Sequence, residues 1–296
     1  MTKTWEPSRI GFGINQQIVN IISLKNMITV KTSRIQKVFE EKSGDKIMSL
    51  FISAGYPDLE STVELILGFE KNGADLIELG MPFSDPLADG PTIQYASNVA
   101  ISNGITMKKI FEMVKEIRKS SEIPIILMGY INPILKYGVE KFCRDAQQCG
   151  VDGLIIPDAP LEESSIISEA ASALNLDMIF LVAPNSSDQR MQMVDDKSSG
   201  FVYCVSVTGV TGARQGNEVA KSVEKFIGRV NKNVTKNPKL VGFGIKNYKD
   251  AQLISKEVDG FIVGSALIDT IRKKYPNKEW KQSVFSFVKE LKFGNI

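Results

Sequence analysis

The segment Asn72-Gly73-Ala74-Asp75-Leu76-Ile77-Glu78-Leu79 joins the end of a helical pattern to a short apolar run. A glycine just past a helix favours a left-handed C-cap, and a short apolar run is typical of a buried strand. Similar turns occur at Cys149-Gly150-Val151-Asp152 and at Glu257-Val258-Asp259-Gly260. The chain therefore reuses one helix-to-strand connection, which predicts a repeated unit of strand and helix.

Outward from this segment, short β-favouring runs alternate with helical patterns. The runs predict eight strands, at Ile47–Ser53, Leu76–Leu79, Ile125–Tyr130, Gly153–Ile156, Met178–Val182, Phe201–Val205, Leu240–Gly242 and Phe261–Val263. The helical patterns lie at Leu59–Asn72, Met107–Lys119, Val139–Gln148, Leu161–Leu174, Ser187–Asp196, Val219–Asn233, Tyr248–Lys256, Ser265–Lys274 and Lys281–Lys292. Eight such units in about 250 residues predict an α/β fold, the (β/α)8 TIM barrel.

A doubly wound open sheet is the alternative architecture. It would need fewer strands and usually a glycine-rich first turn, and Phe51–Tyr56 lacks the G-x-G-x-x-G pattern. No linker rich in Pro, Gly or Ser divides the chain, so we expect a single barrel domain over residues 31–296. Residues 1–30 are expected to form a loosely ordered N-terminal extension.

The N-terminal residues also bear on the compartment. They contain no compact apolar block followed by a small-residue cleavage site, so a secretory signal is not expected. An organelle transit peptide and a true start at Met27 are alternatives. No run reaches the ~18 apolar residues that a membrane span needs. We expect a cytoplasmic protein, with a plastid as the second possibility.

Composition excludes several classes of function. The chain has 36 Lys and Arg residues against 34 Asp and Glu, a net charge of +2, which is too balanced for a nucleic-acid or polybasic membrane surface. Histidine is absent, so any general acid or base must be Asp, Glu, Lys, Tyr or Cys. The three cysteines form no C-x-x-C pair, which indicates a reducing compartment. No spacing supports a metal site.

Two long loops are expected after strands, from Gly80 to about Gly104 and from Ser206 to about Asn217, where a barrel places its active site. Glu78 ends the strand before the first loop, and alternation turns it away from its apolar neighbours toward the barrel mouth. Asp85 and Asp89 follow in a loop stiffened by three prolines. Carboxyl groups in different environments can divide acid and base roles. The alternatives are a Glu78 satisfied by local backbone donors or an ion pair, and loop acids that only cap turns.

Glycine segments follow three of the late strands. They are Thr208–Ala213, Gly242–Ile245 and Gly264–Ala266. Glycine lets backbone N–H groups approach phosphate oxygens, and a helix N-terminus favours the anion. Ser265 can add a hydroxyl donor. Together the three segments predict a phosphorylated ligand, although each alone is explained by a tight turn.

In this order, the segments resemble the tryptophan synthase alpha chain from about Phe51 to Lys274. The most specific piece is Glu78–Gln94, with the sequence ELGMPFSDPLADGPTIQ, and the three glycine segments accompany it. The resemblance implies a lyase that cleaves indole-3-glycerol phosphate to indole and glyceraldehyde 3-phosphate in L-tryptophan biosynthesis. It also implies that Glu78 is the general acid/base and that Asp89 interacts with the indole N–H.

The resemblance assigns further residues by position. Gly212, Gly244, Gly264 and Ser265 would hold the phosphate. Phe51, Tyr203, Phe243 and Ile155 would line the indole pocket, although each alone could be ordinary barrel core. Thr211 and Asp158 would support loop closure, which would exclude water and orient Asp89.

The family also implies a partner. No cofactor is expected on this chain, because pyridoxal phosphate belongs to the beta chain of an α2β2 heterotetramer. Pro82–Ile93 and the segment at Asn132-Pro133 would face that chain. The N-terminal extension, Val207 and Trp280–Ile296 depart from the family pattern. The alternatives are another phosphate-binding barrel, such as a sugar-phosphate isomerase or epimerase, and a catalytically silent activating subunit.

Overall fold

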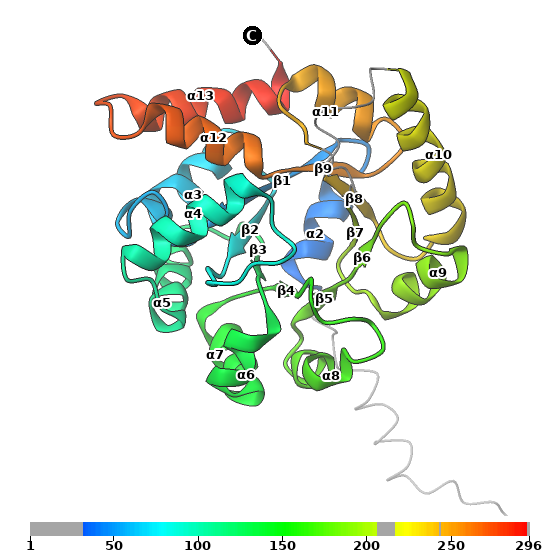
Figure 1. The fold of residues 1–296 in the computed structure, drawn as a ribbon, viewed down its shortest axis with the longest axis horizontal. Coiled ribbons are helices and arrows are strands. Elements are labelled where there is room, and N and C mark those ends of the chain that lie inside the picture. Colours follow the sequence, from blue (N-terminus) through cyan, green and yellow to red (C-terminus); the bar gives the residue numbers. More distant parts are fainter. Residues whose placement is uncertain (1–31, 206–216, 243, 295–296) are drawn as a thin grey trace, which may run out of the picture. The chain divides into compact units, whose positions relative to one another are not determined.

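A computed structural model describes residues 32–205, 217–242 and 244–294. These residues form one sheet in which every pair of neighbouring strands is parallel (Figure 1). The strands are β1 (Ile47–Ser53), β2 (Leu76–Gly80), β3 (Ile125–Met128), β4 (Gly153–Ile155), β5 (Asp177–Ile179), β6 (Leu181–Val182), β7 (Val202–Val205), β8 (Lys239–Gly242) and β9 (Gly260–Val263). Their order in the sheet is β5-β4-β3-β2-β1-β9-β8-β7-β6.

The sheet closes into the predicted TIM barrel. β5 and β6 are the two ends of the strand order, yet only Phe180 separates them in the chain. The run Met178–Val182 was expected to be one strand. It is divided because β5 pairs with β4 while β6 pairs with β7, so this segment turns the corner at which the sheet meets itself.

The helices surround the strands (Figure 1). They are α2 (Arg34–Glu41), α3 (Ser61–Lys71), α4 (Pro91–Ser102), α5 (Met107–Ile117), α6 (Ile131–Tyr137), α7 (Val139–Cys149), α8 (Ser165–Ala173), α9 (Asp188–Lys197), α10 (Asn217–Asn233), α11 (Tyr248–Ser255), α12 (Ser265–Lys274) and α13 (Trp280–Phe293). In the described residues, no helix is both long and apolar enough to cross a membrane.

Three of these helices were not predicted: α2, α4 and α6. The expected long loop from Gly80 to Gly104 is wrong in its second half, where α4 starts at Pro91. Proline is tolerated in the first turn of a helix because the N–H that it lacks has no intrahelical partner there. The same reason explains Pro133 within the first turn of α6. Pro91, one of the three prolines of the expected loop, therefore marks a helix start.

The expected extension over residues 1–30 lies outside the described residues, as does the loop core at 206–216. Residues Ser33–Ile296 form one compact unit.

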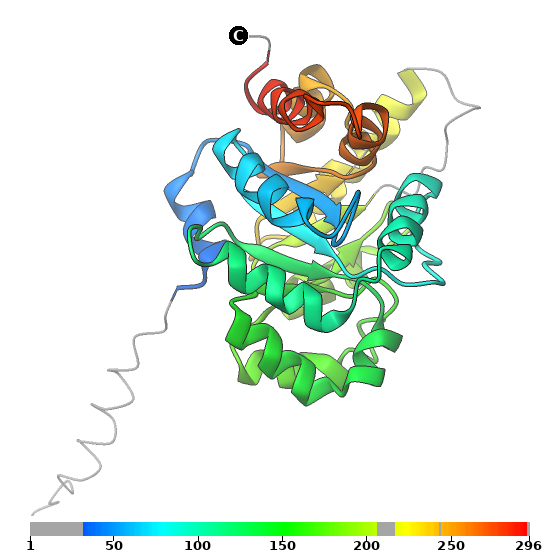
Figure 2. The same cartoon turned by 90° about the vertical axis from the view of Figure 1, so that its left-hand side faces the viewer.

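Two apolar cores hold the barrel together. Alternate strand residues point inward and form a central core of Ile47, Leu76, Ile126, Ile155, Ile179, Phe201, Leu240 and Ile262. Ile35 of α2 joins this core, so α2 closes one end of the barrel. The intervening strand residues pack outward against the helices. Figure 2 shows α2, in dark blue, and α4, in turquoise, at opposite ends of the barrel.

The repeated helix-to-strand turn has a structural role. Asp75 Oδ2 accepts a 2.7 Å hydrogen bond from the backbone N–H of Met48. Asp152 and Asp259 accept equivalent bonds from the first residues of β3 and β8, at 2.8 and 2.7 Å. Each acid therefore satisfies a backbone donor at the start of a neighbouring strand, which explains why an acid recurs in this turn.

Candidate active site

Glu78 is buried inside the barrel on β2. Its neighbours Ile77 and Leu79 pack outward in the helix layer, and the Glu78 side chain is fully inaccessible to solvent. Ser49 Oγ donates a 2.8 Å hydrogen bond to Glu78 Oε1, while Oε2 has no hydrogen-bond partner among the described residues. Burial raises the pKa of Glu78 to about 8, and the Ser49 hydrogen bond lowers it only in part. Among the described residues, neither local backbone donors nor an ion pair accounts for this carboxyl group.

Asp89 lies at the rim of the barrel, in the loop between β2 and α4. Burial raises its pKa to about 6, and a hydrogen bond from the Tyr130 hydroxyl opposes that rise. The Tyr130 oxygen also accepts a 3.0 Å hydrogen bond from the backbone N–H of Ala88. The ring of Tyr130 packs on Phe83, with 5.6 Å between the centroids. One phenol therefore fixes both the loop and its carboxyl group.

Tyr130 was absent from the residues predicted for the site. It lies just beyond β3, 41 residues after Asp89, and nothing local links the two. The strand order places β3 beside β2, which brings the two residues together. The available signal was the position of Tyr130 as the last residue of the predicted strand Ile125–Tyr130, because the carboxyl ends of barrel strands form the active-site end.

Aromatic side chains fill the barrel mouth where glycines leave room. Phe51 and Glu78 are partners across β1 and β2. A Cβ atom at Gly80 would lie 2.7 Å from the Phe51 ring. At Gly242, a Cβ atom would lie 2.9 Å from the Tyr203 hydroxyl oxygen. These two glycines therefore allow both rings to lie against the backbone of the next strand.

Tyr203 links the two acids electrostatically. Burial raises its pKa well above the ordinary value, and the charges of Glu78 and Asp89 raise it further. The two carboxyl groups therefore act on one phenol inside the barrel. A small pocket lies at the mouth beside these groups and is lined by Phe51, Gly80, Met81, Asp89, Ser97, Met128, Gly129, Tyr130 and Pro157.

The other predicted site residues do not line this pocket or lie outside the described residues. Ile155 belongs to the central core with Ile126 and Ile179, and it does not line this pocket. Phe243, Gly212 and Thr211 lie outside the described residues.

The predicted phosphate end lies at the start of α12. Gly264 is the N-cap residue and Ser265, which is exposed, is the first residue of the helix. Gly244 follows β8 with a φ of 62°, a left-handed conformation that favours glycine, and no atom of the other described residues lies within 4 Å of a Cβ placed there. Backbone N–H groups at the open N-terminus of a helix can bind an anion.

Asp158 has a local role. Its Oδ1 accepts a 3.0 Å hydrogen bond from the backbone N–H of Ile131, at the first residue of α6. Its charge also raises the pKa of the neighbouring Tyr130. Asp158 therefore supports the segment that carries Tyr130. The described residues contain no group of three or more His, Cys, Asp or Glu side chains that could hold a metal ion.

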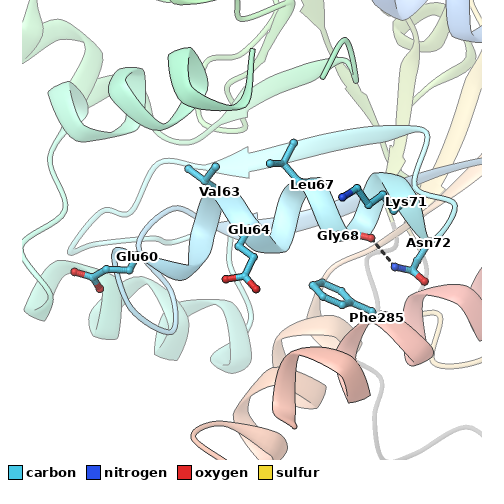
Figure 3. A pocket seen from close by; sticks show the side chains of 8 residues that line it. All are labelled: Glu60, Val63, Glu64, Leu67, Gly68, Lys71, Asn72 and Phe285. Carbon is cyan, nitrogen blue, oxygen red and sulfur yellow. Dashed lines mark hydrogen bonds between the residues drawn. The ribbon is translucent and has the colours of Figure 1, made fainter. Parts of the chain in front are cut away.

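A second pocket lies on the outside of the barrel. It is formed by one face of α3 and by Phe285 of α13 (Figure 3). Its lining residues are Glu60, Val63, Glu64, Leu67, Gly68, Lys71, Asn72 and Phe285. None of them belongs to the predicted site, so the mouth of the barrel remains the candidate.

Comparison with known families agrees with this geometry. The family model described as tryptophan synthase alpha chain matches residues 35–293. The chain belongs to this family. That places it in tryptophan biosynthesis, as the subunit of the alpha reaction.

Individual alpha chains cover nearly the same range. The alpha chain of Geotalea uraniireducens is 47% identical over 264 residues, which is 88% of this chain and 97% of that protein. The alpha chain of Thermoanaerobacter sp. is 45% identical over 262 residues, or 88% of this chain and 98% of that protein. The resemblance of the chain to the tryptophan synthase alpha chain is therefore confirmed along almost its whole barrel.

Solved structures of the family share the fold. The Legionella pneumophila alpha chain superposes with a TM-score of 0.79 at 36% identity, covering 88% of this chain and 96% of that one. A chain of the Pyrococcus furiosus tryptophan synthase complex superposes with a TM-score of 0.74 at 35% identity, covering 83% and 98%. At these identities the likeness extends beyond a shared barrel topology.

Proposed function

We propose that this chain is a lyase that cleaves indole-3-glycerol phosphate to indole and glyceraldehyde 3-phosphate, with Glu78 as general acid/base. The observation that carries the assignment is the carboxyl group of Glu78, which is fully buried yet has one oxygen without a partner in the part of the chain that the structure describes. An unpaired buried polar atom is costly, so such atoms persist where function requires them. A substrate atom could occupy the free position.

The chemistry needs one proton to be donated and another to be accepted. The indole C3 atom must gain a proton, and the glycerol hydroxyl group that becomes the aldehyde must lose one. With a pKa of about 8, Glu78 is mostly protonated at neutral pH and can donate to C3. The carboxylate that results can accept the hydroxyl proton. One residue thus serves both steps.

Asp89 supports the same step from the other side of the indole. With a pKa of about 6, it is mostly ionised at neutral pH. A carboxylate that accepts a hydrogen bond from indole N1–H stabilises the positive charge that develops when C3 is protonated. Tyr130 favours this ionised form, because its hydroxyl group donates a hydrogen bond to Asp89.

The remaining assignments follow the positions of the residues. The phosphate would bind at Gly212, Gly244, Gly264 and Ser265. Phe51 and Tyr203 would contact the indole ring, together with Phe243 and Ile155. Thr211 and Asp158 would support closure of the loop. In this proposal residues 31–296 form the catalytic domain.

A beta chain is the proposed partner and would carry pyridoxal phosphate. The P. furiosus relative was solved as a tryptophan synthase complex. In this chain Leu87 lies in the Asp89 loop and is 94% exposed, although its side chain is large and apolar. A contact with a partner would bury it. An α2β2 assembly in a bacterial cytoplasm fits these observations.

The test is indole release from indole-3-glycerol phosphate, measured with a beta chain present. Glu78→Gln should lower the rate by about 10²- to 10⁴-fold, the usual contribution of a general acid/base. Glu290→Gln is the matched control, because Glu290 is exposed on α13. Equal rates for the parent and Glu78→Gln would refute the role of Glu78. No indole from either would favour the silent activating subunit.

A further inference from the structure

The helix that follows Asp89 holds that residue in place. α4 begins two residues after Asp89, and Gln94 Nε2 donates a 2.9 Å hydrogen bond to the carbonyl oxygen of Asp89. Ser97, one turn further along α4, lines the pocket beside Phe51. The position of Asp89 therefore depends on α4 as well as on Tyr130.

α4 in turn contacts α12, the helix at the phosphate end of the site. Thr92 Oγ1 donates a 3.3 Å hydrogen bond to Asp269 Oδ1. The guanidinium carbon of Arg272 lies 4.0 Å from the centre of the Tyr95 ring, a cation–π geometry. Asp269 and Arg272 stand four and seven residues after Ser265, so they are about one and two turns along α12.

The barrel rim holds the same tyrosine from its other side. Tyr56 follows β1 closely and is buried. Its ring meets the ring of Tyr95 edge-on, with 6.3 Å between the centroids. Tyr95 is 39% exposed, yet it is held between Tyr56 and Arg272. These two contacts restrain the Tyr95 ring although it is partly exposed.

We propose that the contacts Thr92–Asp269 and Tyr95–Arg272 couple the phosphate end of the site to Asp89. This inference rests on the proposed function. The four residues act as positioning residues and do not touch the substrate. Phosphate bound at the start of α12 would fix that helix, and α4 would carry its position to Asp89. A small misplacement of a positioned group costs rate even when the chemistry is intact.

The test compares Arg272→Ala with Lys273→Ala, an adjacent and exposed residue of α12. Arg272→Ala should lower the kcat of indole formation by about 3- to 10-fold and change KM less, because the lost contact acts on the position of Asp89. Lys273→Ala should leave both constants unchanged. Arg272→Lys, which keeps a cation over the ring, should recover most of the rate.

A double-mutant cycle separates coupling from a structural defect. In an Asp89→Asn background, Arg272→Ala should lower the residual kcat no further, because its effect passes through Asp89. If the kcat losses of Arg272→Ala and Asp89→Asn multiply in the double variant, the inference is wrong. It is also wrong if the parent is active and Arg272→Ala has the same kcat as Lys273→Ala. A parent that releases no indole would instead overturn the proposed function, and the inference would fail with it.

Discussion

Glu78 and Asp89 differ in their surroundings more than in their chemistry. Glu78 has one hydroxyl donor in a fully buried position, whereas Asp89 lies beside a phenol at the rim. Burial raises the pKa of both, to about 8 and about 6. If protonated Glu78 and ionised Asp89 form the active state, kcat/KM should decrease at pH values below the pKa of Asp89 and at pH values above the pKa of Glu78.

Tyr130→Phe should move the acidic limb of this pH profile to higher pH. The variant loses the hydrogen bond that lowers the pKa of Asp89, so Asp89 takes up its proton at a higher pH. The measurement is kcat/KM against pH. Tyr137→Phe, at the far end of α6, is the control and should leave the limb in place. An acidic limb that does not move in Tyr130→Phe would show that Asp89 does not set it.

Ser49→Ala should shift the basic limb in the same direction. Ser49 donates to Glu78 and lowers its pKa, so its removal raises that pKa above the present value of about 8. The acidic limb should stay, because burial and the Tyr130 hydrogen bond set the pKa of Asp89. A basic limb unchanged by Ser49→Ala would assign it to a group other than Glu78.

The connections between elements depend on buried acids. Asp152, in the repeated turn, binds Arg118 at 2.7 Å, Arg34 at 3.0 Å and the backbone N–H of Ile125 at 2.8 Å. It therefore joins β3, β4 and the helices α2 and α5 at the closed end of the barrel. If Asp152 is removed, the mostly buried guanidinium group of Arg118 loses its negatively charged partner.

Asp152→Asn should lower the free energy of unfolding by about 3 kcal/mol, as expected when one partner of a buried pair is lost. Glu162→Gln, which disrupts an exposed pair with Arg190, should change it little. Urea denaturation of the two variants and the parent measures both effects. Equal losses would mean that burial does not decide the strength of these pairs.

At the scale of the whole molecule, the buried acid proposed as general acid/base makes the fold less stable as pH rises. The pKa of Glu78 rises from 4.5 to about 8 on folding, so the folded chain binds its proton more tightly than the unfolded chain. The contribution of this group to stability is present below the unfolded pKa and is lost as pH rises through the folded pKa.

Glu78→Gln should therefore be more stable than the parent at alkaline pH. Gln does not titrate, so the difference in the free energy of unfolding between variant and parent should grow between pH 4.5 and about 8. Urea denaturation at several pH values measures it. A constant difference would show that Glu78 titrates normally in the folded chain.

The alternation of strands and helices was predictable from the sequence alone. Apolar runs predicted eight strands, of which Met178–Val182 divides into β5 and β6, and β1 has the predicted bounds, because strands buried on both faces leave a strong local pattern. The inward direction of Glu78 followed from the alternation of side chains along β2. The loops were less predictable, because prolines at Pro91 and Pro133 suit both a turn and the first turn of a helix.

Tertiary structure alone decided what surrounds the two acids. Nothing local predicted that Tyr130 would bond to Asp89, that Ser49 would bond to Glu78, or that Arg272 would lie over Tyr95. These contacts join segments that are 29 to 177 residues apart. Burial and hydrogen bonding from distant strands set a pKa value, and closure of the barrel determines which strands are neighbours. The sequence could therefore name the acids, but only the folded barrel decides their protonation.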